Sequence, residues 1–176
     1  PALTIIKNDL NISFENTQLI LTLYFTFLAF GQILSGPFSD KYGRKPILIL
    51  GASIYSISAF FASLSFNIEI LLILRCFQGF GAAACLSVGR TILSDCYEIK
   101  EAAKEMSKMT AIMAVIPISC FIFGGFLAEF LGWRTNLLAL GLISLILILA
   151  MSFLLNETLI KKAKNISFKK MFIVYR

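Results

Sequence analysis

The run "LALGLISLILILAMSFLL", residues 138–155, decides the fold class of this chain. It contains no charged side chain, and its length is close to the ~20 residues that a helix needs to cross the hydrocarbon core of a bilayer. A strand of a membrane barrel would alternate apolar and polar side chains, and this run does not alternate. Because every backbone polar group must be satisfied inside the bilayer, the sequence predicts a transmembrane helix here.

Four further apolar stretches of similar length precede this run. Hydrophobic residues make up 58% of the 176 residues, charged residues make up 15%, and histidine is absent, whereas soluble domains are roughly 45–50% apolar and about 25% charged. Turns rich in glycine, proline or charge separate the stretches. We therefore predict an all-α integral membrane protein whose five transmembrane helices form one bundle over residues 17–155. The predicted spans are residues 17–38, 46–65, 68–93, 106–130 and 135–155.

Most of the sixteen lysine and arginine residues follow the first, third or fifth predicted span. Lys7 and Arg134 are expected on the opposite side of the membrane. The positive-inside rule places the richer side in the cytoplasm, so the chain is expected to start outside, and residues 156–176 are expected to begin a basic cytoplasmic central loop. The net charge of +6 then reflects membrane topology, with anionic lipid headgroups as neighbours, and nucleic acid is not an expected partner.

The chain begins with Pro1 instead of methionine, and it lacks the pattern of a cleavable secretory signal. A start outside the membrane then requires an earlier helix. We interpret residues 1–16 as an extracytoplasmic lead-in from a first helix that is missing, so we expect the chain to be a fragment.

The four cysteines lie within predicted spans or on the predicted cytoplasmic side. They form no C-x-x-C pair, and reduced, packed thiols are therefore expected. We predict no metal site and no catalytic residues, and hence a protein that is not an enzyme.

The run "GPFSDKYGRKP", residues 36–46, is a dense charged turn between two apolar spans. Gly36 and Pro37 are expected to end the first span, and Gly43 is expected to permit the tight reversal into the second. Asp40 lies at the carboxyl end of a helix, where the helix dipole already places negative charge, so it requires compensation by neighbouring cations. These features alone also fit a simple positive-inside turn with one stray acid.

The spacing of this turn resembles the signature G-x-x-x-D-[RK]-x-G-[RK]-[RK] between the second and third helices of major facilitator transporters. The matching residues are Gly36, Asp40, Lys41, Gly43, Arg44 and Lys45. The frame from Tyr24 to Pro46 is most similar to the bicyclomycin-resistance-like drug/proton antiporters, the Bcr/CflA branch of that family. The resemblance covers almost the whole chain and implies that its five spans correspond to helices 2–6 of the transporter.

The resemblance also implies a role for the charged turn. Asp40 is expected to act as a conformational latch that the carboxyl-terminal half of the transporter compensates in only one state. Arg90 and Asp95, at the end of the third span, are expected to complete the charge cluster.

The run "RCFQGFGAA", residues 75–83, places a polar and small face within the third span. Arg75, Gln78 and Gly79 share this face at helical spacing, and the run resembles the fourth-helix pattern of the same family. An arginine that faces lipid is costly, so we expect this face to line protein or a water-filled cavity and Arg75 to bias a nearby proton site. The alternative is that Arg75 snorkels to the membrane interface.

The run "AVIPISCFIFGGFLAEFLGWR", residues 114–134, resembles the fifth-helix motif of the antiporters. Pro117, Gly124 and Gly125 are in place and are expected to shape the bending of the helix, although Phe121 stands where the family usually has a second proline. Packing between helices through small residues is the alternative for the two glycines.

A polar stripe along the first predicted span is a candidate substrate pathway. Such a stripe would hold lipophilic substrates through apolar and aromatic groups and orient them through amides. Interhelical hydrogen bonding is the alternative. The candidate pathway residues are Gln18, Thr22, Tyr24 and Gln32.

The family resemblance implies a secondary active transporter that works by alternating access. We expect proton-driven efflux of drugs or other small lipophilic compounds across the bacterial cytoplasmic (inner) membrane, with the proton gradient as the energy source and no cofactor. The expected partners are a small-molecule substrate, the lipid bilayer, the missing first helix and the carboxyl-terminal half of the transporter. No acidic residue lies deep in the five spans, so the proton site is expected outside this sequence.

Two other functions remain open at this point. The chain could be a non-transporting membrane scaffold or the remnant of a broken transporter gene, because a recent remnant would keep the family motifs. It could also be part of a major facilitator nutrient symporter. The Gly-Pro and Gly-Gly placements favour an antiporter over a symporter.

Overall fold

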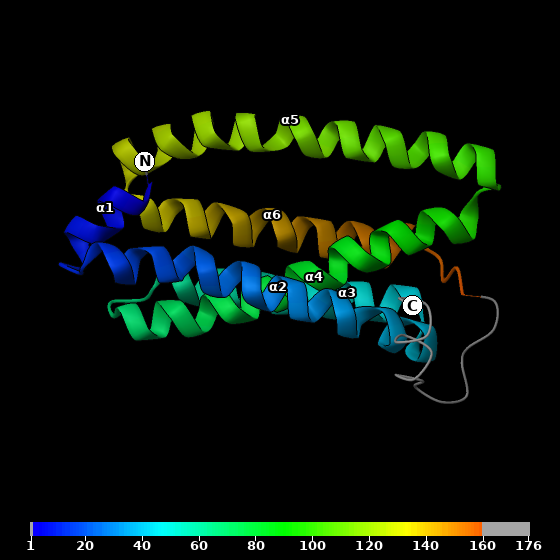
Figure 1. The fold of residues 1–176 in the computed structure, drawn as a ribbon, viewed down its shortest axis with the longest axis horizontal. Coiled ribbons are helices and arrows are strands. Elements are labelled where there is room, and N and C mark those ends of the chain that lie inside the picture. Colours follow the sequence, from blue (N-terminus) through cyan, green and yellow to red (C-terminus); the bar gives the residue numbers. More distant parts are fainter. Residues whose placement is uncertain (1, 160–176) are drawn as a thin grey trace.

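Five long helices, with a short helix across one end, make up the fold of the described residues (Figure 1). The computed structural model describes residues 2–159. Each long helix is long and apolar enough to cross a membrane, and residues 2–159 contain no strand. The predicted all-α membrane fold with five spans is therefore confirmed. The helices are α1 (Ala2–Asp9), α2 (Phe14–Tyr42), α3 (Arg44–Ser63), α4 (Ile68–Cys96), α5 (Ile99–Leu131) and α6 (Trp133–Leu154).

The first long helix extends beyond its predicted end. The prediction that Gly36 and Pro37 end it is wrong, because α2 continues through both residues to Tyr42. Proline inside a helix removes one backbone hydrogen bond, but the final turn is still closed by the N–H of Gly43, which donates to the carbonyl oxygen of Ser39 at 3.0 Å. The reversal itself takes place at Gly43, as the turn pattern predicts.

α5 begins at Ile99, well before its predicted start at residue 106. The added residues include charged residues and alanines, such as 101–104, which form helix readily although they are too polar for hydrocarbon. Hydropathy therefore identified the part of α5 that can lie in the bilayer and missed its first two turns.

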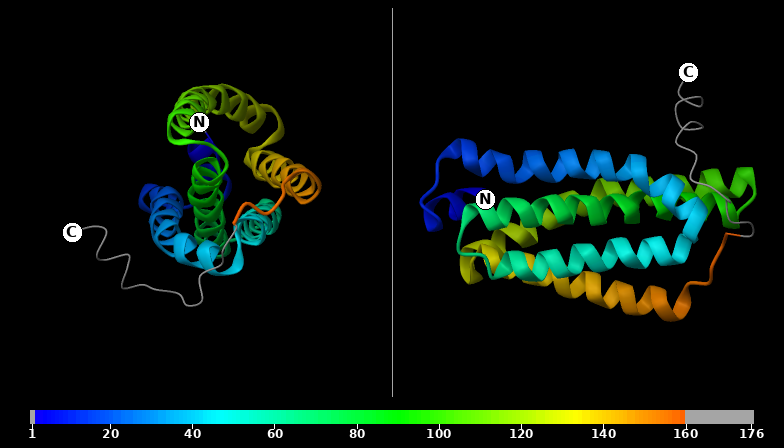
Figure 2. Two further views of the ribbon diagram at one scale, coloured as in Figure 1. Left: turned by 90° about the vertical axis from the view of Figure 1, so that its right-hand side faces the viewer. Right: turned by 90° about the horizontal axis from the view of Figure 1, so that it is seen from below.

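α4 lies in the centre of the bundle (Figure 2). It packs along both α2 and α3, while α2 and α3 hardly touch each other. Small residues permit this close approach, since a Cβ added to Gly31 would lie 2.6 Å from the Cβ of Ala83, and one added to Gly81 would lie 2.5 Å from the carbonyl oxygen of Gly51. α3 in turn packs along α6.

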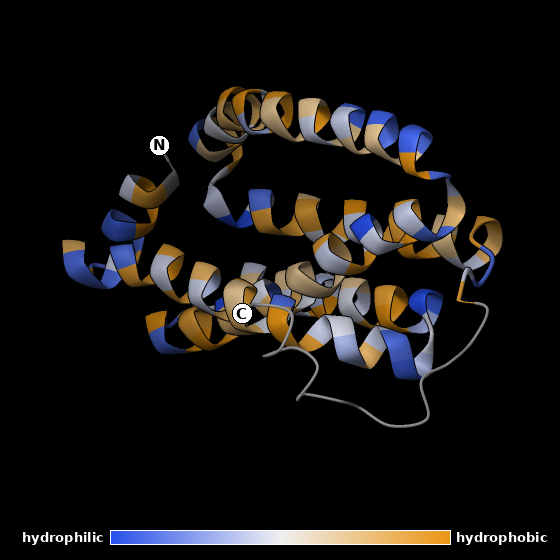
Figure 3. Ribbon diagram, turned by 45° about the vertical axis from the view of Figure 1, so that its right-hand side comes forward, coloured by the Kyte–Doolittle hydropathy of each residue, from blue (hydrophilic) through white to orange (hydrophobic). Residues whose placement is uncertain are grey.

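α5 lies at the margin of the bundle. Its buried residues are Ala102 and Ala128, and its contacts with α4 and α6 are sparse. Large apolar side chains such as Phe121 and Phe126 are exposed along it. Figure 3 shows apolar residues along the middle of the helices and hydrophilic residues gathered toward their ends, which is the distribution expected of helices that cross a bilayer.

The bundle has two ends of different composition. At one end, the α2–α3 turn lies beside the ends of α4 and α6, and we call this the Arg44 end. At the other end, α1, which forms within the predicted lead-in of residues 1–16, folds against α2, α5 and α6, and we call this the α1 end. Residues 160–176, which hold most of the predicted basic loop, lie outside the described residues.

Candidate functional site

The guanidinium of Arg44 joins three helices at the Arg44 end. The Arg44 side chain is only 8% exposed, and its Nη1 donates to Oδ1 of Asp40 at 2.5 Å and to Oγ of Ser39 at 2.7 Å. Its Nε donates to Oδ2 of Asp95 at 2.9 Å. The end of α2, the start of α3 and the end of α4 therefore meet at one cation. We call Ser39, Asp40, Arg44 and Asp95 the Arg44 cluster.

Each charge of the Arg44 cluster would be unfavourable if it stood alone. Asp40 and Asp95 lie in the last turns of α2 and α4, where the helix dipole is already negative, and Arg44 opens α3, where the dipole is positive. Contact between the cation and both carboxylates offsets all three placements. The Asp40 side chain is 54% exposed and that of Asp95 is 26% exposed, so Asp40 is the carboxylate that a further group can reach more easily.

A third carboxylate, from Glu157 after α6, caps the start of α3. Its Oε1 accepts the backbone N–H of Arg44 at 2.9 Å, which is one of the groups that a helix start leaves without an internal partner. Burial acts to raise the pKa of Glu157, but backbone N–H groups of its own segment and of the start of α3 outweigh this effect and hold the pKa below its usual value. The segment after α6 is thereby attached to the charged turn.

Three further residues of the turn motif lie around the Arg44 cluster. Gly43 links α2 to α3 with φ at +114°, a left-handed conformation that favours glycine. Nζ of Lys45 donates to the carbonyl oxygen of Ser152 in α6 at 2.8 Å. The ammonium group of Lys41 lies 5.1 Å from the ring centre of Tyr42. The turn is thus joined to α6 as well as to α4.

The structure does not bring Arg90 into the Arg44 cluster, in contrast to the expectation from the sequence. Arg90 is exposed, and the ion pairs of Arg44 within residues 2–159 go to Asp40 and Asp95. Five residues along a helix correspond to ~500° of rotation, so Arg90 and Asp95 face directions about 140° apart. Gly36 does not pack against another helix either, since no described atom outside its own helix lies within 4 Å of where its Cβ would stand.

Arg75 and Gln78 form a second polar site on α4. Nη1 of Arg75 donates to Oε1 of Gln78 at 3.1 Å, and Gln78 is fully buried. Nε of Arg75 and Nε2 of Gln78 are buried donors that have no acceptor among the described residues. Buried polar groups generally have a partner, so this pair can bind an acceptor from another segment or from a ligand. The hydrogen bond directs the Arg75 guanidinium toward a buried residue of the following turn.

Two tyrosines flank this pair because α4 carries glycines where they pack. A Cβ added to Gly79 would overlap the backbone of Tyr24, and one added to Gly81 would lie 2.8 Å from the backbone nitrogen of Tyr55. Both tyrosines therefore belong to helices that pack against α4 within two turns of Arg75. The site therefore combines one cation, one amide and two phenols from α2, α3 and α4.

A cleft of about 560 Å³ lies between α5 and the other long helices. Its lining is mainly apolar and includes Tyr24 and Tyr55, together with Met109 and Met113 from α5. Arg75 and Gln78 are not among the lining residues, so the cleft begins beside their tyrosine neighbours. The cleft exists because α5 and α6 have few contacts with each other.

The other pathway candidates lie on a face of α2 that the described helices leave uncovered. Gln18 and Thr22 are exposed, and Gln32 is half-buried. Oγ1 of Thr22 donates to the carbonyl oxygen of Gln18 within the same helix at 3.1 Å. Tyr24 is thus the one pathway candidate that lies at the cleft.

The fifth-helix candidates occupy the outer helix of the bundle. Pro117 lies inside α5 and is exposed, while Gly125 is half-buried. The carbonyl oxygen of Gly124 accepts a hydrogen bond from Nδ2 of Asn136 in α6 at 2.8 Å. This contact joins α5 to α6 and favours a packing role for Gly124.

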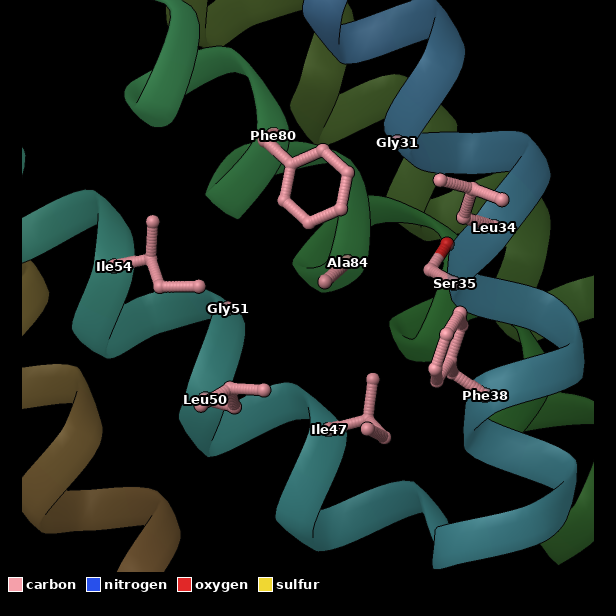
Figure 4. A pocket seen from close by; sticks show the side chains of 10 residues that line it. All are labelled: Gly31, Leu34, Ser35, Phe38, Ile47, Leu50, Gly51, Ile54, Phe80 and Ala84. Atoms are coloured by element: carbon pink, nitrogen blue, oxygen red, sulfur yellow. The ribbon is translucent and has the colours of Figure 1, made fainter. Parts of the chain in front are cut away.

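A smaller hollow of about 150 Å³ separates α2 from α3 (Figure 4). Its ten lining residues come from α2, α3 and α4, and Ser35 is the only polar side chain among them. The hydroxyl of Ser35 donates to the carbonyl oxygen of Gln32 in its own helix at 3.2 Å. Because α4 keeps α2 and α3 apart and the lining carries no charge, we assign this hollow to helix packing.

Comparison with known proteins shows the family of the chain. The sequence profile of the Major Facilitator Superfamily matches residues 1–172. The chain belongs to this family.

Similar proteins are the bicyclomycin resistance protein homolog of Haemophilus influenzae (31% identical over 90% of this chain) and the uncharacterized MFS-type transporter YdgK of Bacillus subtilis (35% identical over 90% of this chain). The multidrug resistance protein MdtL of Escherichia coli is 29% identical over 87% of this chain. The chain spans about 40% of the length of these curated relatives.

Membership of the Major Facilitator Superfamily confirms the resemblance that the charged turn indicated. With five long apolar helices, the chain is part of a multi-pass protein of the cell membrane. The family consists of membrane transporters, which confirms the prediction that the chain is not an enzyme.

Sequence reasoning missed Ser39 of the Arg44 cluster, and it also missed Glu157 and Tyr55. Glu157 carried a visible signal, since it is an isolated acid between an apolar span and a basic segment. Tyr55 carried a weaker one, as a polar aromatic residue within an apolar span. In both cases the partner lies on another helix, so the sequence alone did not indicate which group each residue would meet.

Proposed function

We propose that this chain is part of a secondary active transporter that exports drugs or other small lipophilic compounds by alternating access. The names of the similar proteins from Haemophilus influenzae and Escherichia coli, which refer to bicyclomycin and multidrug resistance, support this substrate class. In this proposal the proton gradient supplies the energy, no cofactor takes part, and the protein lies in the bacterial cytoplasmic membrane with its Arg44 end in the cytoplasm.

The Arg75–Gln78 pair is the observation that carries this proposal. Arginine stays protonated in proteins, and a buried charge requires an opposite charge or several hydrogen-bond partners. Within residues 2–159, no carboxylate forms an ion pair with Arg75, and its side chain donates to Gln78. A carboxylate from another segment of the full-length transporter would complete the site, and its proton affinity would depend on its distance from Arg75. Such a group can couple proton binding to substrate binding.

The cleft beside α5 supports a second part of the proposal, that a further helix of the transporter packs there. α4 lies between α2 and α3, which hardly touch, and α5 and α6 are separated in a similar way. Major facilitator halves consist of two related three-helix repeats. A helix in the cleft would therefore repeat the position of α4, and in this proposal it is the first helix of the transporter.

The Arg44 cluster supports the proposal of a conformational latch. Arg44 is almost buried, whereas more than half of the Asp40 side chain is exposed. Asp40 can therefore remain paired with Arg44 while it gains or loses a contact with another part of the transporter. In this proposal that part is the carboxyl-terminal half, and the contact forms in only one state of the cycle.

Efflux of a fluorescent cation from energised membrane vesicles tests the proposed transport by the full-length protein. We expect efflux that a proton uncoupler abolishes, that Arg75→Lys partly retains, and that Arg75→Gln mostly loses. Full proton-coupled efflux by Arg75→Gln would remove Arg75 from the mechanism. Absence of any transport by normally inserted wild-type protein would instead support a scaffold or remnant, and proton-driven uptake would indicate a symporter.

A further inference from the structure

A carboxylate at the end of α1 binds two residues at the start of α6. Oδ2 of Asp9 accepts a hydrogen bond from Nε1 of Trp133 at 2.9 Å and one from Nη1 of Arg134 at 2.6 Å. The two donors are adjacent in the sequence and directly follow Gly132, whose φ of +85° turns the chain from α5 into α6. This turn therefore sets the direction in which both donors meet α1.

The same arginine also holds the connection between α3 and α4. Nη2 of Arg134 donates to the carbonyl oxygen of Ser65 at 3.2 Å. Its guanidinium lies 4.4 Å from the ring centre of Trp133 and 5.6 Å from that of Phe66, within the range of cation–π attraction. One side chain thus joins α1, the α3–α4 connection and α6.

An apolar layer lies beneath these polar contacts. Ile6 of α1 is 3% exposed and Trp133 is 2% exposed. The rest of the layer comes from α2, α3, α4 and α6, so every long helix except α5 contributes a side chain to it. The other members are Ile20, Ala62, Leu71 and Leu137.

The strength of this arrangement comes from its combination of contacts. An isolated exposed ion pair contributes little to stability, and Asp9 and Arg134 are both partly exposed. Here, however, the carboxylate also accepts the N–H of an indole that is otherwise buried, and loss of that acceptor would leave a buried donor without a partner. The indole N–H and then the guanidinium hold the pKa of Asp9 below its ordinary value of 3.8. Because that pKa is lowered, the contact persists above pH 3.8 and is lost only as the pH falls through the lower, folded-state value.

We propose that Asp9, Trp133 and Arg134 form a permanent brace that keeps α1, α6 and the α3–α4 connection together as one rigid unit in every state of the transport cycle. α1 is then a fixed part of the wall at this end and not a lid that opens for substrate. The brace rests on the proposed function only in so far as a transport cycle exists, since its contribution to stability is independent of transport.

The single tryptophan of the chain gives a direct readout of the brace. We would use the full-length protein, with any tryptophan outside this segment replaced by phenylalanine, and record Trp133 emission with and without substrate and with and without a proton gradient. A permanent brace predicts the same emission in all conditions, whereas Asp9→Asn shifts the emission because it removes the charge that faces the indole. Glu15→Gln, which changes an exposed acid at the same end, is the matched control and should leave the emission unchanged. An emission change on substrate binding would overturn the proposal.

A covalent bridge provides the second test. In a cysteine-free background, Asp9→Cys together with Arg134→Cys removes the brace, and a bifunctional thiol reagent that spans the lost contact restores it. We expect the unbridged protein to lose several degrees of thermal stability and part of its transport rate, and the bridged protein to regain both. Loss of transport on bridging would show that α1 must move during the cycle. Unchanged thermal stability of the unbridged double variant would show that the Asp9–Arg134 contact does not stabilise the protein.

The two readouts separate the brace from the proposed function. If the wild-type protein transports no probe, the proposed function fails, while the thermal stability of the bridged and unbridged proteins still tests the brace. If the double variant does not insert, Trp133→Phe keeps an aromatic ring but removes the N–H together with part of the buried indole, and the brace predicts a smaller loss of thermal stability than in the double variant. Unchanged stability of Trp133→Phe would count against the brace.

Discussion

The two ends of the bundle are held together by different interactions. At the Arg44 end, a guanidinium that is 8% exposed is surrounded by carboxylates from two other helices. At the α1 end, the guanidinium of Arg134 is 35% exposed, shares a single carboxylate and lies over aromatic rings. Removal of one partner from a buried ion pair costs ~3–5 kcal/mol, whereas exposed pairs contribute about 0–1 kcal/mol. The Arg44 end therefore depends on charge, and the α1 end depends on the buried indole of Trp133 and on the acceptor that Asp9 provides for its N–H.

Both ends leave out the same helix. The contacts at the Arg44 end come from α2, α3, α4, α6 and the segment after α6, and the apolar layer at the α1 end comes from α1, α2, α3, α4 and α6. Neither set includes a side chain of α5. The comparison thus divides the five long helices of the described residues into four that contribute to both sets of contacts and one, α5, that contributes to neither.

The largest expected difference between the two ends is their side of the membrane. In a cysteine-free, full-length protein, we expect Lys7→Cys to react with an impermeant thiol reagent added to intact cells and Lys41→Cys to react only after the cells are opened. The charge bias of the sequence is the physical reason. Labelling of position 41 from outside would reverse the orientation and place the Arg44 cluster on the wrong side for the proposed latch.

The next largest effect is expected at the Arg44 cluster. Arg44→Gln leaves two carboxylates without their cation, and we expect the free energy of unfolding to fall by about 2–3 kcal/mol, at the lower end for a buried pair because Asp40 is partly exposed. Thermal unfolding in detergent or lipid nanodiscs measures this loss. Arg90→Gln is the matched control, because Arg90 is an exposed arginine in the half of α4 that also carries Asp95. This variant should change the free energy of unfolding little. Equal losses of stability in both variants would contradict the claim that the ion pairs of the buried Arg44 stabilise this end of the bundle.

A smaller effect is expected from the cap that Glu157 provides. Glu157→Gln weakens the acceptor for the first N–H groups of α3 and should reduce stability by ~0.5–1 kcal/mol, after allowance for solvent screening. The lowered pKa of Glu157 gives this effect a pH dependence. The carboxylate contributes above its unfolded value of 4.5, and its contribution disappears as the pH falls through the lower, folded-state value. The difference in melting temperature between wild type and variant should therefore be constant at neutral pH and vanish in acid. A difference that persists in strong acid would assign the effect to something other than the charge.

The smallest effect is expected where α5 meets α6. Asn136→Ala removes the hydrogen bond to the carbonyl oxygen of Gly124, and interhelical hydrogen bonds in membranes contribute only about 0.6 kcal/mol on average. We expect little change in global unfolding but faster hydrogen exchange or larger spin-label mobility in α5. Ser152→Ala is a suitable control, because the hydroxyl of Ser152 bonds within α6, to the carbonyl oxygen of Ile148. A large loss of global stability would show that α5 is more firmly joined than its contacts indicate.

The elements that the sequence predicted well are those with a local cause. Hydropathy identified five spans because each apolar run can satisfy its own backbone within the bilayer. The position of Asp40 at a helix end indicated that neighbouring cations compensate it, and Arg44 does so. The end of α2 was predicted wrongly at Pro37, since a helix can continue through proline when the surrounding contacts hold it. Arg90 was wrongly assigned to the Arg44 cluster, because the prediction used its distance from Asp95 along the sequence and not the direction in which each side chain leaves the helix.

The elements that could not be predicted depend on distant partners. Glu157 reaches Arg44 across 113 residues, and Asp9 reaches Arg134 across 125 residues. No pattern within one span records such a contact. The position of Tyr55 near Arg75 likewise depends on Gly81, because the absence of a side chain there lets α3 lie close against α4. The sequence does not show that these two helices are in contact.

The central position of α4 has a consequence for the order of assembly. α2 and α3 leave the ribosome before α4 and are joined by a tight turn, yet they hardly touch each other in the finished bundle, and their close contacts are with glycines and alanines of α4. Helices in a membrane associate only after each has inserted. The hairpin of α2 and α3 therefore has no packed interface of its own during synthesis, and it must wait for α4 before these two helices acquire a fixed relative position.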